Sequence, residues 1–206
     1  YQIFSLGHGS VSEEIKGKNK NIKRKSLIKI SEEGAIFRNY LNGDKVYLTP
    51  ERSIELQRHF GADLIFVLDE CTPFNVSKKY TENSMYLSHR WAKRCSDAFK
   101  TTYSKFDSQS GSSGRQYLYG IIQGGVYDDL RKIACEETCS GDYNRLAIGG
   151  SLGGSKEQMH DIFSFCSDLI DKSKPVHVLG IGGLDDILHG VSCGYDTFDC
   201  VSPTRI

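Results

Sequence analysis

The feature that most constrains the fold of this chain is an alternation between short apolar runs and longer stretches with helical periodicity. Hydrophobic and β-branched residues fill five runs of strand length, namely Asp63–Asp69, Gln116–Gln123, Arg145–Gly149, Val176–Ile181 and Asp196–Val201. Strands that alternate with helices are typical of a parallel sheet with crossover helices. The sequence therefore predicts an α/β protein.

Helix signals stand before or between these runs. One helix is expected to begin at Pro50, which suits a first helical turn, and to end at Gly61. A second is expected after Ser155, where a capping box precedes an apolar stripe of helical spacing. A long helix is expected from about Lys79 to Phe106.

Five β/α repeats fit either an open doubly wound sheet or a (β/α)8 TIM barrel. The first predicted strand is not followed by the glycine pattern of a dinucleotide-binding turn, so we favour the barrel, incomplete in this chain. A chain of 206 residues with 38% hydrophobic residues is expected to form one domain over residues 1–206.

The balance of charges argues against an overall attraction to nucleic acid. Lys plus Arg and Asp plus Glu each number 26, so any nucleic-acid contact must be local. Basic residues gather between Lys16 and Lys29 with almost no apolar ones. We expect residues 7–30 to form a flexible basic insert, either a solvated loop or an arm that contacts RNA.

Cysteine usage and hydropathy indicate the compartment. The seven cysteines form an odd set without a Cys-x-x-Cys pair, which indicates reduced and mostly buried thiols. No apolar run approaches the roughly 20 residues that span a bilayer, and the N-terminus lacks a signal-peptide pattern. The sequence therefore predicts a cytoplasmic protein with no membrane partner.

Polar residues and glycines follow the predicted strands where a parallel barrel would gather them at one mouth. They are Asp69, Gln123, Gly149 with Gly150, and Asp199. Carboxylates accept from an N–H pair, and amide or backbone N–H groups donate to a carbonyl; a guanine-type base offers both along its Watson–Crick edge. Alternatively, a strand-end carboxylate such as Asp69 caps the next helix.

Four segments carry a resemblance to a known family. They are Gly61-Ala-Asp-Leu-Ile-Phe-Val-Leu-Asp-Glu-Cys-Thr-Pro73, Gly120-Ile-Ile-Gln-Gly-Gly-Val126, Ala147-Ile-Gly-Gly150 and Gly194-Tyr-Asp-Thr-Phe-Asp-Cys-Val-Ser-Pro-Thr-Arg205. In order and spacing these resemble the tRNA-guanine (queuine) transglycosylases, and the likeness covers the chain apart from the basic insert.

The resemblance implies a TIM-barrel pentosyltransferase that modifies tRNA. Such an enzyme exchanges guanine at the wobble position of GUN anticodons for queuine or a 7-deazaguanine precursor, in the formation of queuosine. The exchange is a double displacement at the ribose C1′, with a covalent enzyme–tRNA intermediate, as in retaining glycosidases.

The resemblance also assigns roles to residues. Asp199 matches the nucleophile. Asp69 and Gln123 match residues that hold the edge of the base, and Gly150 matches a backbone donor to its carbonyl. Tyr1 matches an aromatic residue that stacks on the ring. Leu179 matches an apolar wall of the base pocket, although it also suits ordinary strand core. Positions that match tRNA-contacting loops are Gly180, Ile181, Gly182, Gly183, Leu184, Asp185, Asp186, Thr204, Arg205 and Ile206.

Two parts of the family's machinery would lie outside this sequence. Its general acid/base is the Asp of an Asp-Ser-Gly-Gly string just before the position of Tyr1, and its structural zinc site lies beyond that of Ile206. We therefore expect no cofactor in this chain, a structural zinc in the full-length protein, and no complete turnover by this segment alone. The implied partners are tRNA, a purine-like base (queuine, 7-aminomethyl-7-deazaguanine or guanine) and a second subunit in a homodimer or heterodimer.

Gly153 bears on the choice of base, because bacterial relatives commonly have a branched residue there. Because glycine has no side chain, the pocket would be wider beside the substituent at position 7 of the base. A wider pocket favours queuine, whose substituent there is bulky.

Two other functions remain open. One is a non-catalytic RNA-binding subunit, although such paralogues lose the nucleophile and Asp199 is present. The other is a serine hydrolase, because Gly149-Gly-Ser-Leu-Gly153 fits the nucleophile elbow around Ser151, with Asp185 and His189 following in the right order.

Overall fold

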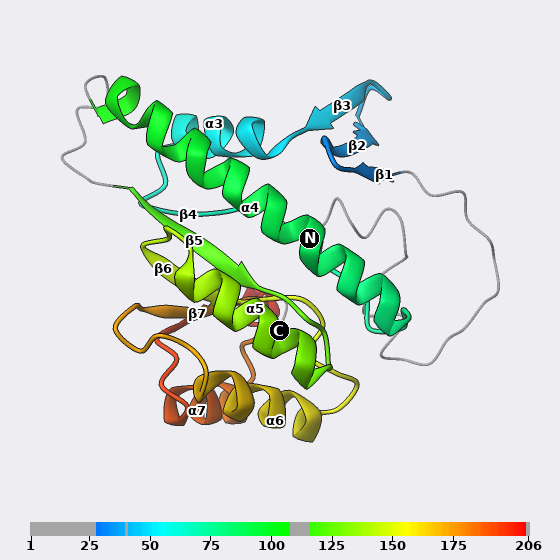
Figure 1. The fold of residues 1–206 in the computed structure, drawn as a ribbon, viewed down its shortest axis with the longest axis vertical. Helices are drawn as coiled ribbons and strands as arrows, with labels where there is room; N and C mark the ends of the chain where they lie inside the picture. Colours follow the sequence, from blue (N-terminus) through cyan, green and yellow to red (C-terminus); the bar gives the residue numbers. More distant parts are fainter. Residues whose placement is uncertain (1–27, 40, 108–115, 205–206) are drawn as a thin grey trace.

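The computed structural model describes residues 28–39, 41–107 and 116–204 (Figure 1). Its central feature is a parallel sheet of five strands in chain order. The strands are β4 (Leu64–Phe66), β5 (Tyr117–Ile122), β6 (Arg145–Ile148), β7 (Val176–Val178) and β8 (Thr197–Phe198). All four neighbouring pairs are parallel, so the five predicted strands are confirmed, each shorter than its apolar run.

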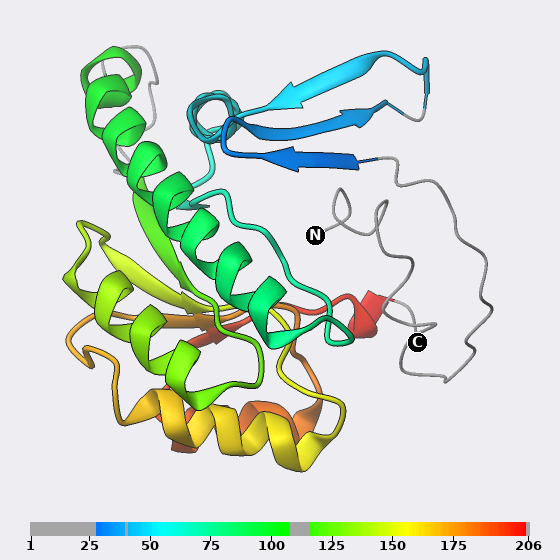
Figure 2. The same ribbon diagram turned by 45° about the vertical axis from the view of Figure 1, so that its right-hand side comes forward.

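The crossover helices cover the outer side of this sheet. They are α4 (Lys78–Asp107), α5 (Asp128–Ser140), α6 (Lys156–Ser167) and α7 (Leu184–Ser192). Figure 2 shows α4, α5 and α6 side by side along one face of the sheet. The arrangement is a curled, incomplete (β/α) barrel, as predicted, and a 3-10 turn, η1 (Ser202–Thr204), follows β8.

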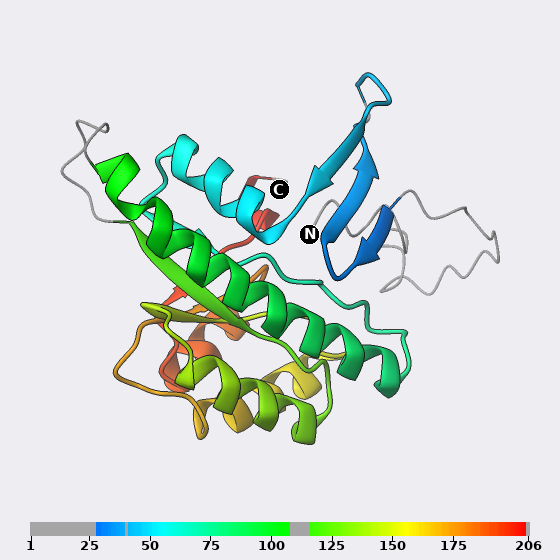
Figure 3. The same cartoon turned by 45° about the horizontal axis from the view of Figure 1, so that its top comes forward.

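A three-stranded antiparallel sheet precedes the barrel strands and was not predicted. Its strands are β1 (Ile28–Ser31), β2 (Gly34–Arg38) and β3 (Lys45–Leu48), in that order. β1 begins within the predicted flexible insert, so residues 28–30 form a strand instead; residues 7–27 lie outside the described residues. Helix α3 (Pro50–Phe60) has the predicted ends, follows β3 and packs beside α4 (Figure 3).

The turn between β1 and β2 is fastened to α4. The backbone carbonyl of Glu32 accepts hydrogen bonds from Trp91 Nε1 at 2.9 Å and from Arg94 Nη1 at 2.7 Å. Arg90 makes a two-pronged contact with the Glu32 carboxylate, at 2.7 and 2.8 Å. Because Trp91 is fully buried, these contacts fix the small sheet against the barrel.

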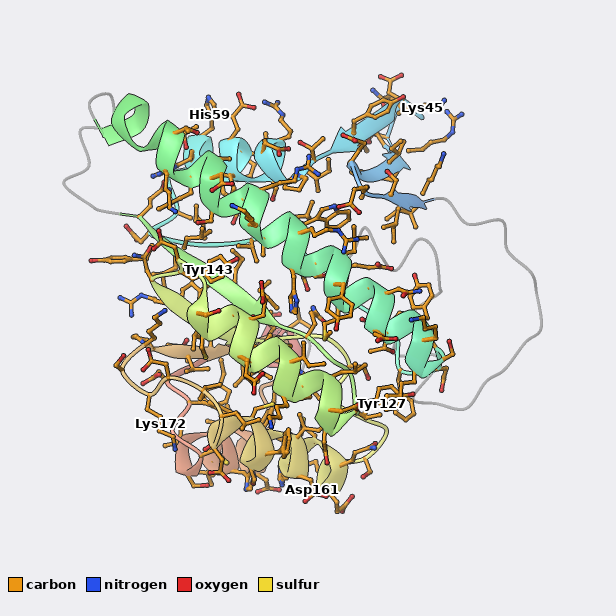
Figure 4. All side chains as sticks on the ribbon, in the orientation of Figure 1. Lys45, His59, Tyr127, Tyr143, Asp161 and Lys172 are labelled. Carbon is orange, nitrogen blue, oxygen red and sulfur yellow. The ribbon has the colours of Figure 1, made fainter. Side chains whose placement is uncertain are left out.

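The interior divides into two apolar clusters. One gathers β6, β7, α5 and α6, and the other joins β4 and β5 to α3 and α4, with Tyr143 (Figure 4) packed against it. The seven cysteines are free, as predicted, but only Cys95, Cys135 and Cys166 are buried. Among the described helices, none combines the length and apolar character needed to cross a membrane.

Candidate functional site at the carboxyl edge of the sheet

The predicted site residues follow the strands in turn. Gln123 comes directly after β5, Leu179 after β7 and Asp199 after β8, while Asp69 stands three residues beyond β4. Since the strands are parallel, these positions share one edge of the sheet. The topology therefore brings the strand-end residues to one side of the barrel.

Asp69 and Gln123 contact each other directly. The amide Nε2 of Gln123 donates a hydrogen bond to Oδ2 of Asp69. Gln123 is fully buried, and its Oε1 has no hydrogen-bond partner among the described residues. A buried acceptor without a donor is uncommon in folded proteins and marks a position where a ligand can supply one.

The loop that carries Asp69 is held to α4 on both sides of that residue. The backbone N–H of Leu68 donates to Sγ of Cys95 at 3.3 Å, and that of Glu70 donates to Oγ of Ser88 at 2.9 Å. Burial raises the pKa of Asp69 from 3.8 to about 6, against the opposing effect of the Gln123 hydrogen bond. The carboxyl therefore changes charge close to neutral pH.

The loop after β6 closes on Gln123. Gly150 has a φ of 73°, and a Cβ added there would collide with Oε1 of Gln123. A Cβ added to the adjacent Gly149 would lie 3.3 Å from Cδ1 of Leu179 and 3.4 Å from Nε2 of Gln123. Only glycines allow this approach, so the loops after β5, β6 and β7 converge.

Arg131 of α5, which the sequence did not single out, ties two of these loops together. Its fully buried guanidinium donates to the carbonyl of Ile122 at 3.1 Å, of Gly125 at 2.7 Å and of Ser151 at 3.1 Å. These carbonyls belong to the end of β5 and to the loops after β5 and β6. The cation thereby fixes both loops relative to each other.

Asp199 stands at the far end of the same edge. Its side chain is 61% exposed, and its Oδ1 accepts from the backbone N–H of Gly180 at 2.8 Å and from Nε2 of His177 at 3.1 Å. Its Oδ2 has no hydrogen bond among the described residues. Gly180 follows Leu179, so the contacts run continuously from Asp69 to Asp199 across the five strands.

The structure modifies the prediction for tRNA contacts. Leu184, Asp185 and Asp186 form the first turn of α7 and not a loop. Asp186 is also buried, with its Oδ1 3.0 Å from Nε2 of His160, so its side chain faces α6. Gly180–Gly183 are a loop and Thr204 is exposed, whereas Tyr1, Arg205 and Ile206 lie outside the described residues.

The serine hydrolase alternative is not supported by the geometry. Nε2 of His189 contacts the carbonyl of His160 at 3.2 Å and Oγ of Ser164 at 3.4 Å, on α6. Asp185 lies 3.7 Å from Nζ of Lys156. In the described part of the chain neither residue contacts Ser151, so no triad is assembled.

A cavity between two helices lies away from the strand-end edge, and the described residues form no metal-binding cluster. A cavity of about 240 Å³ opens between α4 and α5, lined among others by His89, Ser96 and Tyr143, and contains no strand-end residue. Within residues 28–39, 41–107 and 116–204 no three His, Cys, Asp or Glu side chains cluster closely enough to hold a metal ion.

The fold and the site define the class of protein: an α/β barrel with two carboxylates and a buried amide at the carboxyl edge of its strands. Residues 15–206 match the family described as queuine tRNA-ribosyltransferase, and the chain belongs to that family.

Curated relatives agree with this assignment. A protein named queuine tRNA-ribosyltransferase from Roseiflexus sp. is 38% identical over 207 residues, which cover 100% of this chain and 52% of that protein. Proteins of the same name from Protochlamydia amoebophila and Actinobacillus pleuropneumoniae are 38% and 39% identical, and the alignments cover 50% and 47% of their lengths. The chain spans about half the length of the curated relatives it matches.

Proposed function

We propose that the protein containing this chain is a tRNA-guanine transglycosylase, which replaces guanine at the wobble position of GUN anticodons with a 7-deazaguanine base. The observation that supports the proposal is the exposure and hydrogen bonding of the Asp199 carboxylate. This carboxylate is largely exposed, is held by the described residues through Oδ1 alone, and stands at the edge where Asp69 and Gln123 meet. A nucleophile for ribose requires such a free carboxylate oxygen.

The reaction proposed is a double displacement. Asp199 attacks C1′ of the ribose, the bond to N9 of guanine breaks with the electron pair leaving on guanine, and a general acid protonates the leaving base. The incoming base then gives its N9 proton to the conjugate base of that general acid, attacks C1′ from the opposite face and releases the carboxylate. Two inversions give net retention at the anomeric carbon, as in retaining glycosidases.

The neighbouring residues would read the base. Ionised Asp69 accepts from the N1–H and the exocyclic amine, while Gln123 and the backbone N–H of Gly150 donate to the carbonyl oxygen. The bond from Nε2 of Gln123 to Oδ2 of Asp69 holds these two base-reading groups side by side. Leu179 supplies an apolar wall beside Gly149, and Tyr1 is assigned to stack on the ring.

The direct test is to trap the covalent intermediate. Full-length protein is incubated with a GUN-anticodon tRNA without an incoming base, denatured, and examined for a protein–tRNA adduct. The unmodified protein and Asp161→Asn, which removes a carboxylate exposed on α6, should both form the adduct. Asp199→Asn should abolish it. Equal adduct from Asp199→Asn would refute the assignment, and no adduct from any variant would favour the non-catalytic subunit.

The base used is proposed to be queuine itself. Gly153 is proposed to widen the pocket beside the substituent at position 7 of the base, and the structure supplies a different reason for glycine there. Its φ is 107°, and a Cβ would lie 2.5 Å from Oε1 of Gln158. A competition assay between queuine and 7-aminomethyl-7-deazaguanine decides the question, and exclusive use of the smaller base would contradict it.

Several partners complete the proposal. The loop Gly180–Gly183 and the segment from Thr204 to Ile206 are proposed to contact tRNA, and the full-length protein is proposed to form a dimer and to hold a structural zinc. Metal analysis and light scattering of the full-length protein test the last two. No step of the reaction is assigned to zinc.

A further inference from the structure

His177 is a polar residue in the middle of a buried parallel strand. Its side chain is only 13% exposed, between Val176 and Val178, which are both buried. The rings of Phe66 on β4 and Tyr119 on β5 lie 5.4 Å and 6.1 Å from its own. A polar side chain in such surroundings needs hydrogen-bond partners, and both of its ring nitrogens have one.

The two partners of His177 determine the direction of the hydrogen bonds. Nε2 lies 3.1 Å from Oδ1 of Asp199, and Nδ1 lies 2.8 Å from Oγ1 of Thr197, its register partner on β8. An ionised carboxylate only accepts, so Nε2 is the donor; in the neutral ring Nδ1 then accepts from the Thr197 hydroxyl. This chain of contacts orients the imidazole toward Asp199.

Oδ1 of Asp199 therefore receives two donors, the ring N–H of His177 and the backbone N–H of Gly180. Oδ2 receives none from the described residues. A carboxylate fixed in this way leaves one particular oxygen, Oδ2, for bond formation, and the fixed oxygen can keep its donors when the other oxygen is esterified.

We propose that His177 is a positioning residue for the Asp199 nucleophile, an inference that rests on the proposed function. With Gly180 it holds Oδ1, so that Oδ2 forms the bond to C1′. In the covalent intermediate Oδ1 becomes the ester carbonyl oxygen. When the incoming base displaces the ester, the C1′–Oδ2 bond breaks and its electron pair returns to the carboxylate, where the two N–H donors stabilise the developing charge on Oδ1.

The two half-reactions respond differently to this arrangement. A carboxylate accepts hydrogen bonds more strongly than an ester, so donors on Oδ1 favour displacement of the intermediate more than its formation. Loss of one charge-assisted hydrogen bond corresponds to about a 10- to 100-fold change in a rate. Without His177, the covalent intermediate should persist.

The test compares His177→Leu with His177→Gln in the full-length protein. Gln is the conservative variant, because its amide Nε2 can donate where the imidazole Nε2 does. Adduct formation is measured with GUN-anticodon tRNA, and adduct release is measured after adding free guanine. We expect release to be about 10- to 100-fold slower in His177→Leu, formation to change less, and Gln to restore most of the release rate. Thr197→Val should slow release in the same direction by a smaller factor.

Circular dichroism and thermal unfolding establish that each variant is folded. Release from His177→Leu at the unmodified rate would overturn the inference while leaving the proposed function intact. So would an equal slowing of both half-reactions by Leu and Gln, which is the signature of a purely structural role. Absence of an adduct in the unmodified protein would overturn the inference together with the proposed function.

Discussion

The carboxyl of Asp69, which is largely but not completely buried, leads to a quantitative prediction about stability. Its pKa is about 6 in the folded protein, compared with an ordinary value of 3.8. The folded state therefore binds this proton more tightly than the unfolded state does. The resulting contribution to stability is fully present below about pH 4 and is lost as the pH rises through about 6. Well above pH 6 the loss amounts to about 3 kcal/mol, an upper figure because Asp69 is partly exposed.

Asp69→Asn removes the ionisation but keeps an oxygen that can accept from Nε2 of Gln123. The variant should therefore be more stable than the unmodified protein at neutral pH, and its advantage should grow by about 1.5 kcal/mol from about pH 5 to about pH 8. The same change removes the acceptor for a guanine-type edge, so affinity for guanine should fall. A residue that destabilises the fold and is needed for binding is expected at a functional site.

The assay is urea unfolding of full-length protein at several pH values, followed by circular dichroism. Asp161→Asn is the matched control, because it removes a carboxylate exposed on the outer face of α6 (Figure 4). An advantage of Asp69→Asn that does not vary with pH, or that Asp161→Asn reproduces, would refute the reasoning.

Three other substitutions test the scaffold of the site. Gly150→Ala should lower guanine affinity about 10-fold or more, because its Cβ displaces the Gln123 amide; calorimetric titration checks this, with circular dichroism as the control for folding. Arg131→Met should reduce the free energy of unfolding by about 3 kcal/mol, since three carbonyls each lose a donor, although that of Ile122 keeps the Gly149 N–H; a loss below about 1 kcal/mol in urea unfolding would contradict the role assigned to the guanidinium. Trp91→Phe should lose about 1–2 kcal/mol through the hydrogen bond to the Glu32 carbonyl, and Tyr86→Phe, an exposed change on the same helix, should lose almost nothing.

The barrel portion of the fold could be predicted because its signals are local. Each of the strands β4 to β8 is an apolar run in the sequence, and parallel topology then places the residues that follow the strands on one edge. The grouping of Asp69, Gln123 and Gly150 follows from that topology and needs no knowledge of side-chain contacts. The ends of the strands were less predictable, since pairing stops where a loop turns away and not where apolar residues end.

What the sequence did not reveal depends on contacts between distant residues. The strands β1 to β3 are short and partly polar, so their sequence signal is weak. Their sheet is held to the barrel by the hydrogen bonds of Trp91 and Arg94 of α4 to its first turn. Arg131 is a charged residue on a helix, a type that usually faces water, and its three acceptors come from separate loops. His177 gave one usable signal, a polar residue inside an otherwise apolar strand, but its partners depend on the register of β7 and β8.

Arg131 fixes the loops after β5 and β6 through their backbone rather than through their side chains. All three of its acceptors are main-chain carbonyls, so the guanidinium recognises the path of the backbone and none of the side chains that project from it. Residues other than the glycines on the loops after β5 and β6 can therefore be exchanged without disturbing this support. For protein engineering, a change of base preference should begin with loop side chains and leave Arg131 in place.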